Sequence, residues 1–136
     1  MTAAHTTLIA HLYTLLAATP CLVIHRGSTH PDEIATVDFD RRMVTIDATA
    51  DLGEFAASLM YGIRHLHRGP CYEGDEAATA RAVAEEVARL LAPAEQLPAA
   101  FETADPNQVA LDLGIDIDTA RRGIALATHD KTTRQD

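Results

Sequence analysis

The sequence is poor in cysteine, in basic residues and in long apolar runs. Its two cysteines, Cys21 and Cys71, lie far apart and form no C-x-x-C pair, so we expect reduced structural thiols rather than a disulfide or a zinc knuckle. No apolar run approaches the length of a membrane span, and the N-terminus shows neither the basic region nor the small-residue cleavage site of an export signal. These absences favour a cytoplasmic protein with no membrane segment, and a length of 136 residues favours a single domain.

Acidic residues outnumber basic ones by 20 to 11, which gives a formal net charge of −9. Proteins bind nucleic acids largely through Lys and Arg side chains that neutralise phosphates, so the average field of this chain would repel a phosphate backbone. We therefore expect nucleic acid to be an unfavourable partner. The same acidity favours solubility and a basic protein partner.

The clearest pattern in the chain is an amphipathic helix between residues 51 and 70. Asp51 followed three positions later by Glu54 predicts a capping box at the start of this helix. Gly69-Pro70 predicts its end. Apolar residues recur at steps of three and four and so fall on one stripe of the helix; they are Leu52, Phe55, Leu59, Ile63 and Leu66. We predict that the rest of the chain is organised around this helix.

The remaining segments predict an α+β fold with a small antiparallel or mixed sheet packed on helices. A helix is expected over residues 6–18, a buried strand over the apolar run 21–25, and a β-hairpin over 33–47. An alanine-rich helix is expected over 76–91, with Ala84 facing outward. Its buried side is expected to comprise Ala80, Val83, Val87, Leu90 and Leu91.

Residues 105–127 resemble a helix-turn-helix, with an alanine in the first helix and a glycine opening the turn. Where such a unit reads DNA, its second helix presents basic and amide side chains to phosphates and bases. Only Arg121 and Arg122 are available here, and Asp112, Asp116 and Asp118 oppose them. We expect the unit to pack against a core formed by residues 1–104, and we expect residues 128–136 to form a flexible tail.

Three stretches carry a family resemblance: HLHRGP at 65–70, ARLLAP at 88–93 and VALDLGIDIDTARR at 109–122. Together with the central helix, they make the chain from Cys21 to Ala127 similar to the small actinobacterial and phage members of the ImmA/IrrE-type metallopeptidase family. The resemblance implies a zincin-like fold, in which a sheet forms one wall of a cleft and the central helix forms its floor. It also implies a helix-turn-helix-like unit at the C-terminal end.

The catalytic motif of that family is where this sequence departs from it. In the family, H-E-x-x-H supplies two zinc-binding histidines and a glutamate that acts as general base. Tyr61 and Gly62 stand at the first two of these positions, so only His65 remains, and Ala80 falls where the family has its third ligand. The resemblance thus implies a pseudo-peptidase without a cofactor that binds another protein. The implied partner is a repressor-type regulator of a phage or mobile element, or a component of host defence, and the implied binding surface is a remnant cleft around Tyr61, Gly62, Arg64, His65 and His67.

Two other functions stay open. An active zinc peptidase would need rebuilt ligands, for which His65, His67 and Glu76 are candidates. Two histidines two positions apart point about 200° apart on a helix, so they could share one ion only if the helix ended between them. Such an enzyme would also need a new general base, the loss of which typically costs about 10²- to 10⁴-fold in rate. A DNA-binding regulator would use Arg121 and Arg122, and its binding should weaken steeply with salt.

Overall fold

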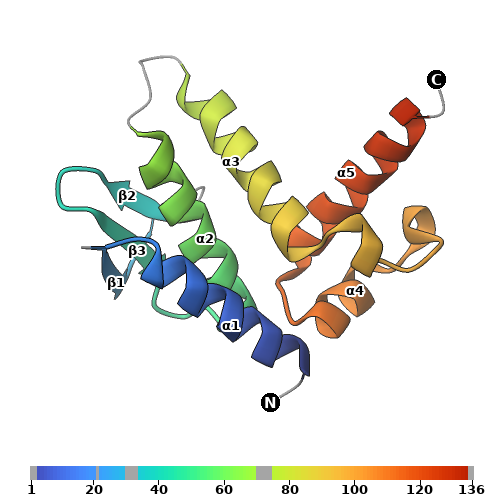
Figure 1. Cartoon of the computed structure of the whole chain (residues 1–136), viewed down its shortest axis with the longest axis horizontal. Coiled ribbons are helices and arrows are strands. Elements are labelled where there is room, and N and C mark those ends of the chain that lie inside the picture. Colours follow the sequence, from blue (N-terminus) through green and yellow to red (C-terminus); the bar gives the residue numbers. More distant parts are fainter. Residues whose placement is uncertain (1–2, 21, 30–33, 70–74, 135–136) are drawn as a thin grey trace.

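The computed structural model describes residues 3–20, 22–29, 34–69 and 75–134, which form an α+β fold. The helices and strands follow in the order α1 (Ala3–Ala17), β1 (Val23–Gly27), β2 (Thr36–Asp38), β3 (Met43–Asp47), α2 (Leu52–Arg68), α3 (Glu76–Leu91), α4 (Pro106–Leu113) and α5 (Ile117–Arg134). Two short 3-10 turns, Ala94–Gln96 and Phe101–Thr103, lie between α3 and α4. The sheet lies at one end of the molecule beside α2, and α4 and α5 lie at the other end, with α3 between α2 and α5 (Figure 1).

The sheet is mixed and has the strand order β1-β3-β2. β2 and β3 are antiparallel neighbours joined by a short turn, which confirms the predicted hairpin, whereas β1 runs parallel to β3. The strand predicted at 21–25 is displaced to Val23–Gly27, and it is exposed rather than buried. The reason is its position at the sheet edge, where Val23 and Ile24 keep 48% and 37% of their surface exposed. An apolar run alone does not distinguish an edge strand from a central one.

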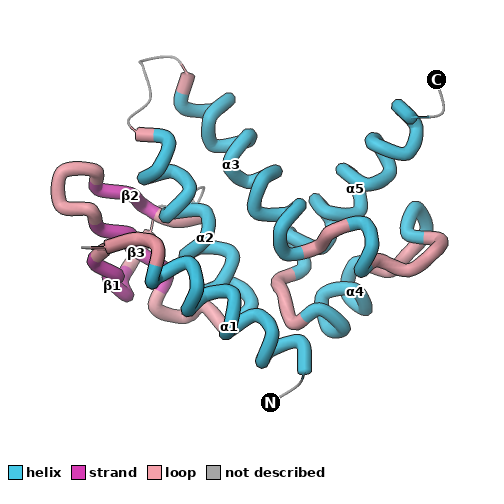
Figure 2. The backbone as a smooth tube through the Cα atoms, viewed as in Figure 1, coloured by secondary structure: helices cyan, strands magenta, loops and turns pink. Residues whose placement is uncertain are grey.

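Helix α2 begins and ends where its sequence predicts. The Asp51 carboxylate accepts the backbone N–H of Glu54 at 2.8 Å, and the Glu54 carboxylate accepts that of Asp51 at 3.4 Å, which completes the capping box. Gly69 ends the helix with a φ of 85°. The burial of α2 differs from the prediction, because residues 56–63 are all buried instead of a single stripe. The sheet, α1 and α3 each cover part of its surface (Figure 2).

Helix α3 has the predicted bounds, but two of its side chains face opposite to expectation. Ala84 is buried and Leu90 is 38% exposed. The physical reason is that α3 is covered from two directions, by α2 on one side and by α5 on the other. Ala84 would face solvent if only one side of α3 were covered, but it is enclosed because both sides are covered. The core lies between β3, α2 and α3, and its largest fully buried side chains are Ile46, Leu59, Ile63, Val44 and Val83.

The C-terminal unit consists of α4, a turn at Gly114 and the long helix α5. Gly114 adopts the left-handed conformation with a φ of 69°, and its N–H donates to the carbonyl of Ala110. The flexible tail predicted from residue 128 is wrong up to Arg134, because α5 continues to that residue. Asp130 and Lys131 hold this part of α5 in place through ion pairs with side chains of α3 and the preceding 3-10 turn. In the described ranges, no helix combines the length and apolar character needed to cross a membrane.

Candidate functional site

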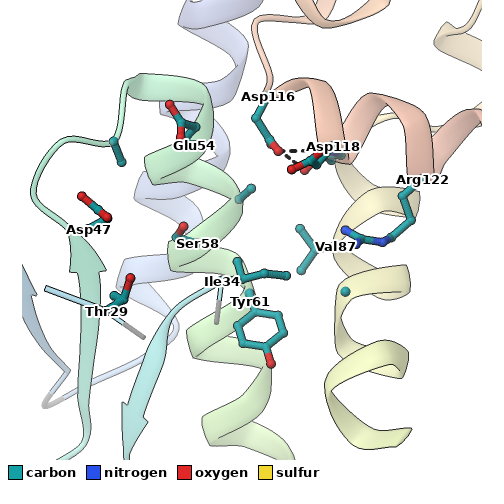
Figure 3. Close-up of a pocket in the computed structure, with 14 residues that line it drawn as sticks. Thr29, Ile34, Asp47, Glu54, Ser58, Tyr61, Val87, Asp116, Asp118 and Arg122 are labelled. Atoms are coloured by element: carbon teal, nitrogen blue, oxygen red, sulfur yellow. Dashed lines mark hydrogen bonds between the residues drawn. The ribbon is translucent and has the colours of Figure 1, made fainter. Parts of the chain in front are cut away.

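A cleft of about 640 Å³ lies between α2, the ends of the sheet, α3 and the beginning of α5 (Figure 3). It is lined by polar and apolar side chains together. Among the residues labelled in the figure are Thr29, Ile34, Asp47, Glu54, Ser58, Tyr61, Val87, Asp116, Asp118 and Arg122. We refer to this hollow as the α2–α5 cleft.

Helix α2 forms one wall of the cleft with Glu54, Ser58 and Tyr61. These residues follow one another at steps of four and three, so they lie on one face of the helix. Ser58 and Tyr61 are mostly buried, and each leaves only a small edge at the cleft surface. The hydroxyls of Ser58 and Tyr61 and the Glu54 carboxylate give this otherwise apolar wall its polar groups.

Helix α5 forms the opposite wall with its first turns. The Asp116 carboxylate accepts the backbone N–H of Thr119 at 3.1 Å and its hydroxyl at 2.5 Å, which caps the helix and fixes the entry of the chain into it. Asp118 and Arg122 follow on the cleft side of the helix. The half-buried Arg122 side chain extends from α5 across the cleft towards Val87 of α3 (Figure 3).

Carboxylates dominate the charge of the α2–α5 cleft. Asp47, Glu54, Asp116 and Asp118 line it, against Arg122 as the one lining residue with a permanent positive charge among the described residues. The Thr49 hydroxyl and backbone N–H donate to Asp47 at 2.6 and 2.8 Å and lower the pKa of that carboxyl below its ordinary value. Asp47 is therefore ionised at neutral pH. The cleft accordingly favours a cationic group, with Arg122 available for an acceptor beside it.

The predicted binding residues are split between different surroundings. Tyr61 lines the cleft, but its ring also meets the His65 ring edge-on, with the centroids 5.5 Å apart. His65 contacts Phe39 of the hairpin in the same way at 5.8 Å. Its Nδ1 and the Nε of Arg64 are buried and have no hydrogen-bond partner within the described ranges. His67 lies exposed near the end of α2.

Gly62 faces the sheet rather than the cleft. A Cβ atom at this position would lie 2.3 Å from Cγ1 of Val44, far inside a normal contact distance. Glycine is therefore required so that α2 can approach β3 closely. This accounts for a glycine inside a helix, where it costs about 1 kcal/mol relative to alanine.

The candidate zinc ligands do not fit a zinc site. His65 and His67 could share an ion only if the helix ended between them, but α2 continues to Arg68. Glu76 is exposed at the start of α3. Over the ranges that the structure describes, no three His, Cys, Asp or Glu side chains come together in a way that could hold a metal ion. Cys71 lies outside those ranges.

The two arginines predicted for DNA binding lie in different places. Arg121 is exposed and pairs with Asp118 at 3.5 Å. Arg122 lines the α2–α5 cleft instead, whereas the sequence predicted both arginines as candidates for contacting DNA. The structure thus brings Tyr61 and Arg122, predicted for two unrelated functions, to one hollow. The acidic residues of the cleft were not predicted from the sequence as site residues. For Glu54 on α2 a signal was present, because its spacing to Ser58 and Tyr61 places all three on one helix face.

The fold and the cleft define the protein only as an α+β protein with an acidic hollow beside its central helix. No protein-family model, curated protein or solved structure matches the chain.

Proposed function

We propose that the protein acts by binding a segment of another protein in the α2–α5 cleft. The observation that carries this proposal is the composition of the cleft, which is lined by four carboxylates and one half-buried arginine together with apolar side chains. A peptide segment with a Lys or Arg side chain and neighbouring apolar groups complements such a surface. The volume of about 640 Å³ is sufficient for a few side chains.

The resemblance to ImmA/IrrE-type metallopeptidases supports the same proposal from the sequence side. It suggests a pseudo-peptidase that holds a repressor-type regulator, such as that of a phage or a mobile element. Position 62, where the family has its general base, is occupied by a glycine that packs against the sheet. Binding without cleavage is the function that these positions support best.

The test is a selection of displayed peptides on the full chain, followed by affinity measurements with the enriched peptides. Arg122→Ala should weaken binding by at least about fivefold, because it removes the donor for an acceptor group of the peptide that lies beside the bound cation. Arg121→Ala is the control, since Arg121 lies on the same helix but does not line this cleft. Its pair with Asp118 is exposed and therefore weak, so the variant should change affinity by less than about twofold.

Three results would contradict the proposal. These are a failure to enrich any peptide above background, an equal loss of affinity in the two arginine variants, and cleavage of the selected peptides. Equal losses in the two variants together with a steep salt dependence for duplex DNA would favour the DNA-binding alternative instead. Tyr61→Phe adds a second probe of the cleft, because it retains the buried ring and removes only the hydroxyl.

A further inference from the structure

A second hollow of about 780 Å³ adjoins the α2–α5 cleft, with which it shares lining residues. It is bounded by α4, the turn after it, and the first residues of α1, α2 and α5. We refer to it as the α4–α5 groove. It shares three carboxylates with the α2–α5 cleft, those of Glu54, Asp116 and Asp118, but Leu111 lines only this groove and Arg122 lines only the cleft.

The floor of the α4–α5 groove is apolar and open. Leu111 on α4 is 73% exposed and Ile117 at the start of α5 is 40% exposed, which makes them two of the most exposed large apolar side chains in the described ranges. The half-buried Leu52 and the buried Ile115 continue the same surface. Contiguous exposed apolar surface is unfavourable in water, and it commonly marks a place where a partner docks.

The rim of the groove is acidic. Asp51 and Glu54 cap the start of α2, and Asp116 caps the start of α5, so their carboxylates are fixed at the edge of the apolar floor. Asp118 stands beside them with an 80% exposed side chain, and Arg121 is the one arginine on this rim in the part of the chain that the structure describes. The rim therefore presents more negative than positive charge to a partner.

The charges decide between the possible occupants. A second copy of this chain would itself carry a net charge of −9, so it is disfavoured by repulsion. A nucleic acid is disfavoured for the same reason, because the cap and first turn of α5 present Asp116 and Asp118 where a DNA-reading helix presents donors to bases. An amphipathic helix with Lys or Arg beside its apolar stripe matches both the floor and the rim.

We infer that the α4–α5 groove binds an amphipathic helix of another protein, one that carries basic residues on both flanks of its apolar stripe. The inserted apolar side chains contact Leu111 and Ile117, and the flanking cations face the carboxylates of Asp116 and Asp118. The apolar floor makes this inference separable from the α2–α5 cleft, because the side chains of the floor are absent from that hollow, whereas Asp116 and Asp118 line both.

The experiment uses the full chain and two synthetic helical peptides of about 18 residues. Both peptides carry leucine at the same i, i+4 and i+7 positions, and their flanks carry lysine in one and glutamate in the other. The lysine peptide should bind saturably, and Leu111→Ala should weaken it at least about tenfold, as expected for the loss of one buried leucine contact. Leu90→Ala removes a leucine exposed on α3 outside both hollows, and it should change affinity by less than about twofold.

A second pair of variants tests the rim. Asp118→Asn should weaken the lysine peptide about twofold to fivefold, and less at high salt, whereas Asp40→Asn in the hairpin turn removes the same charge without effect. Equal binding of the lysine and glutamate peptides would overturn the inference. So would equal effects of Leu111→Ala and Leu90→Ala, no saturation up to about 1 mM, or a dimer of the chain that Leu111→Ala abolishes.

Discussion

Replacing Gly62 with alanine should destabilise the protein, although alanine is the better helix former. The added Cβ would lie 2.3 Å from Cγ1 and 2.8 Å from Cγ2 of Val44. Val44 is fully buried on the central strand, and its β-branched side chain is restricted at χ1. It therefore cannot rotate into solvent to make room, and α2 would have to move away from the sheet.

The magnitude follows from two opposing contributions. Alanine gains about 1 kcal/mol over glycine in a helix interior, whereas overpacking a well-packed core costs about 1–3 kcal/mol. Because the contact with Val44 is so short, we expect the upper part of that range and a net loss of about 1–2 kcal/mol. Val44→Ala alone should cost about 2 kcal/mol by leaving a cavity. In the double variant, the new methyl group fills part of that cavity, so the two losses should fall short of additivity by about 1–2 kcal/mol.

The assay is urea unfolding followed by circular dichroism, with the free energy of unfolding extrapolated to water for the parent, both single variants and the double variant. Ala125→Gly at an exposed position of α5 measures the helix-propensity contribution separately, and it should cost about 1 kcal/mol. The reasoning is refuted if Gly62→Ala raises the free energy of unfolding by about 1 kcal/mol, or if the cycle is additive within about 0.5 kcal/mol.

Three further predictions concern α4 and the ion pairs of α5. Gly114→Ala puts a Cβ into a turn with a φ of 69° and should cost about 1 kcal/mol in a thermal or urea melt. At the other end of α4, Asp105→Ala removes the helix cap and should cost about 0.5–2 kcal/mol, whereas Asp105→Asn should retain most of the stability. Hydrogen bonds from the Arg89 and Lys131 side chains lower the pKa values of the Asp130 and Glu102 carboxyls, respectively, below their ordinary values. The stabilisation they give is therefore complete above those values and is lost as the pH falls through the folded-state pKa values. Unfolding measured between neutral and acid pH should show a smaller acid loss in an Asp130→Asn, Glu102→Gln double variant, and an unchanged loss would contradict this assignment.

Local chemistry made much of the fold predictable. The capping box of Asp51 and Glu54, the stop at Gly69 and the hairpin before α2 each depend on residues close together in the sequence, and each is confirmed. The range of α3 was predictable for the same reason. In these segments the signal and the structure that it specifies lie within a few residues of each other.

The errors arise where the outcome depends on distant segments. Ala84 and Leu90 have the opposite exposure to that predicted, because the placement of α5 decides which faces of α3 are covered. The end of α5 depends on Asp130 and Lys131 finding partners far along the chain. The cleft was not predictable from spacing alone, because it forms only when α5 brings Arg122 opposite α2.

Residues Tyr61 to His65 have the spacing of the H-E-x-x-H motif, but they do not all face one site. Neighbouring positions on a helix differ by about 100°, so Tyr61 lines the cleft while Gly62 faces Val44 of the sheet. Gly62→Glu, which would place the glutamate of the H-E-x-x-H motif at this position, would direct a carboxylate into the packed contact with β3. Desolvation and overpacking together predict a loss above about 3 kcal/mol and no peptidase activity, measured by urea unfolding and by incubation with the selected peptides. Changes at position 62 should therefore act through stability, whereas changes at Arg122 should act through binding at unchanged stability. A Gly62→Ala protein that remains folded yet loses peptide affinity as strongly as Arg122→Ala would show that the helix face and the cleft cannot be separated in this way.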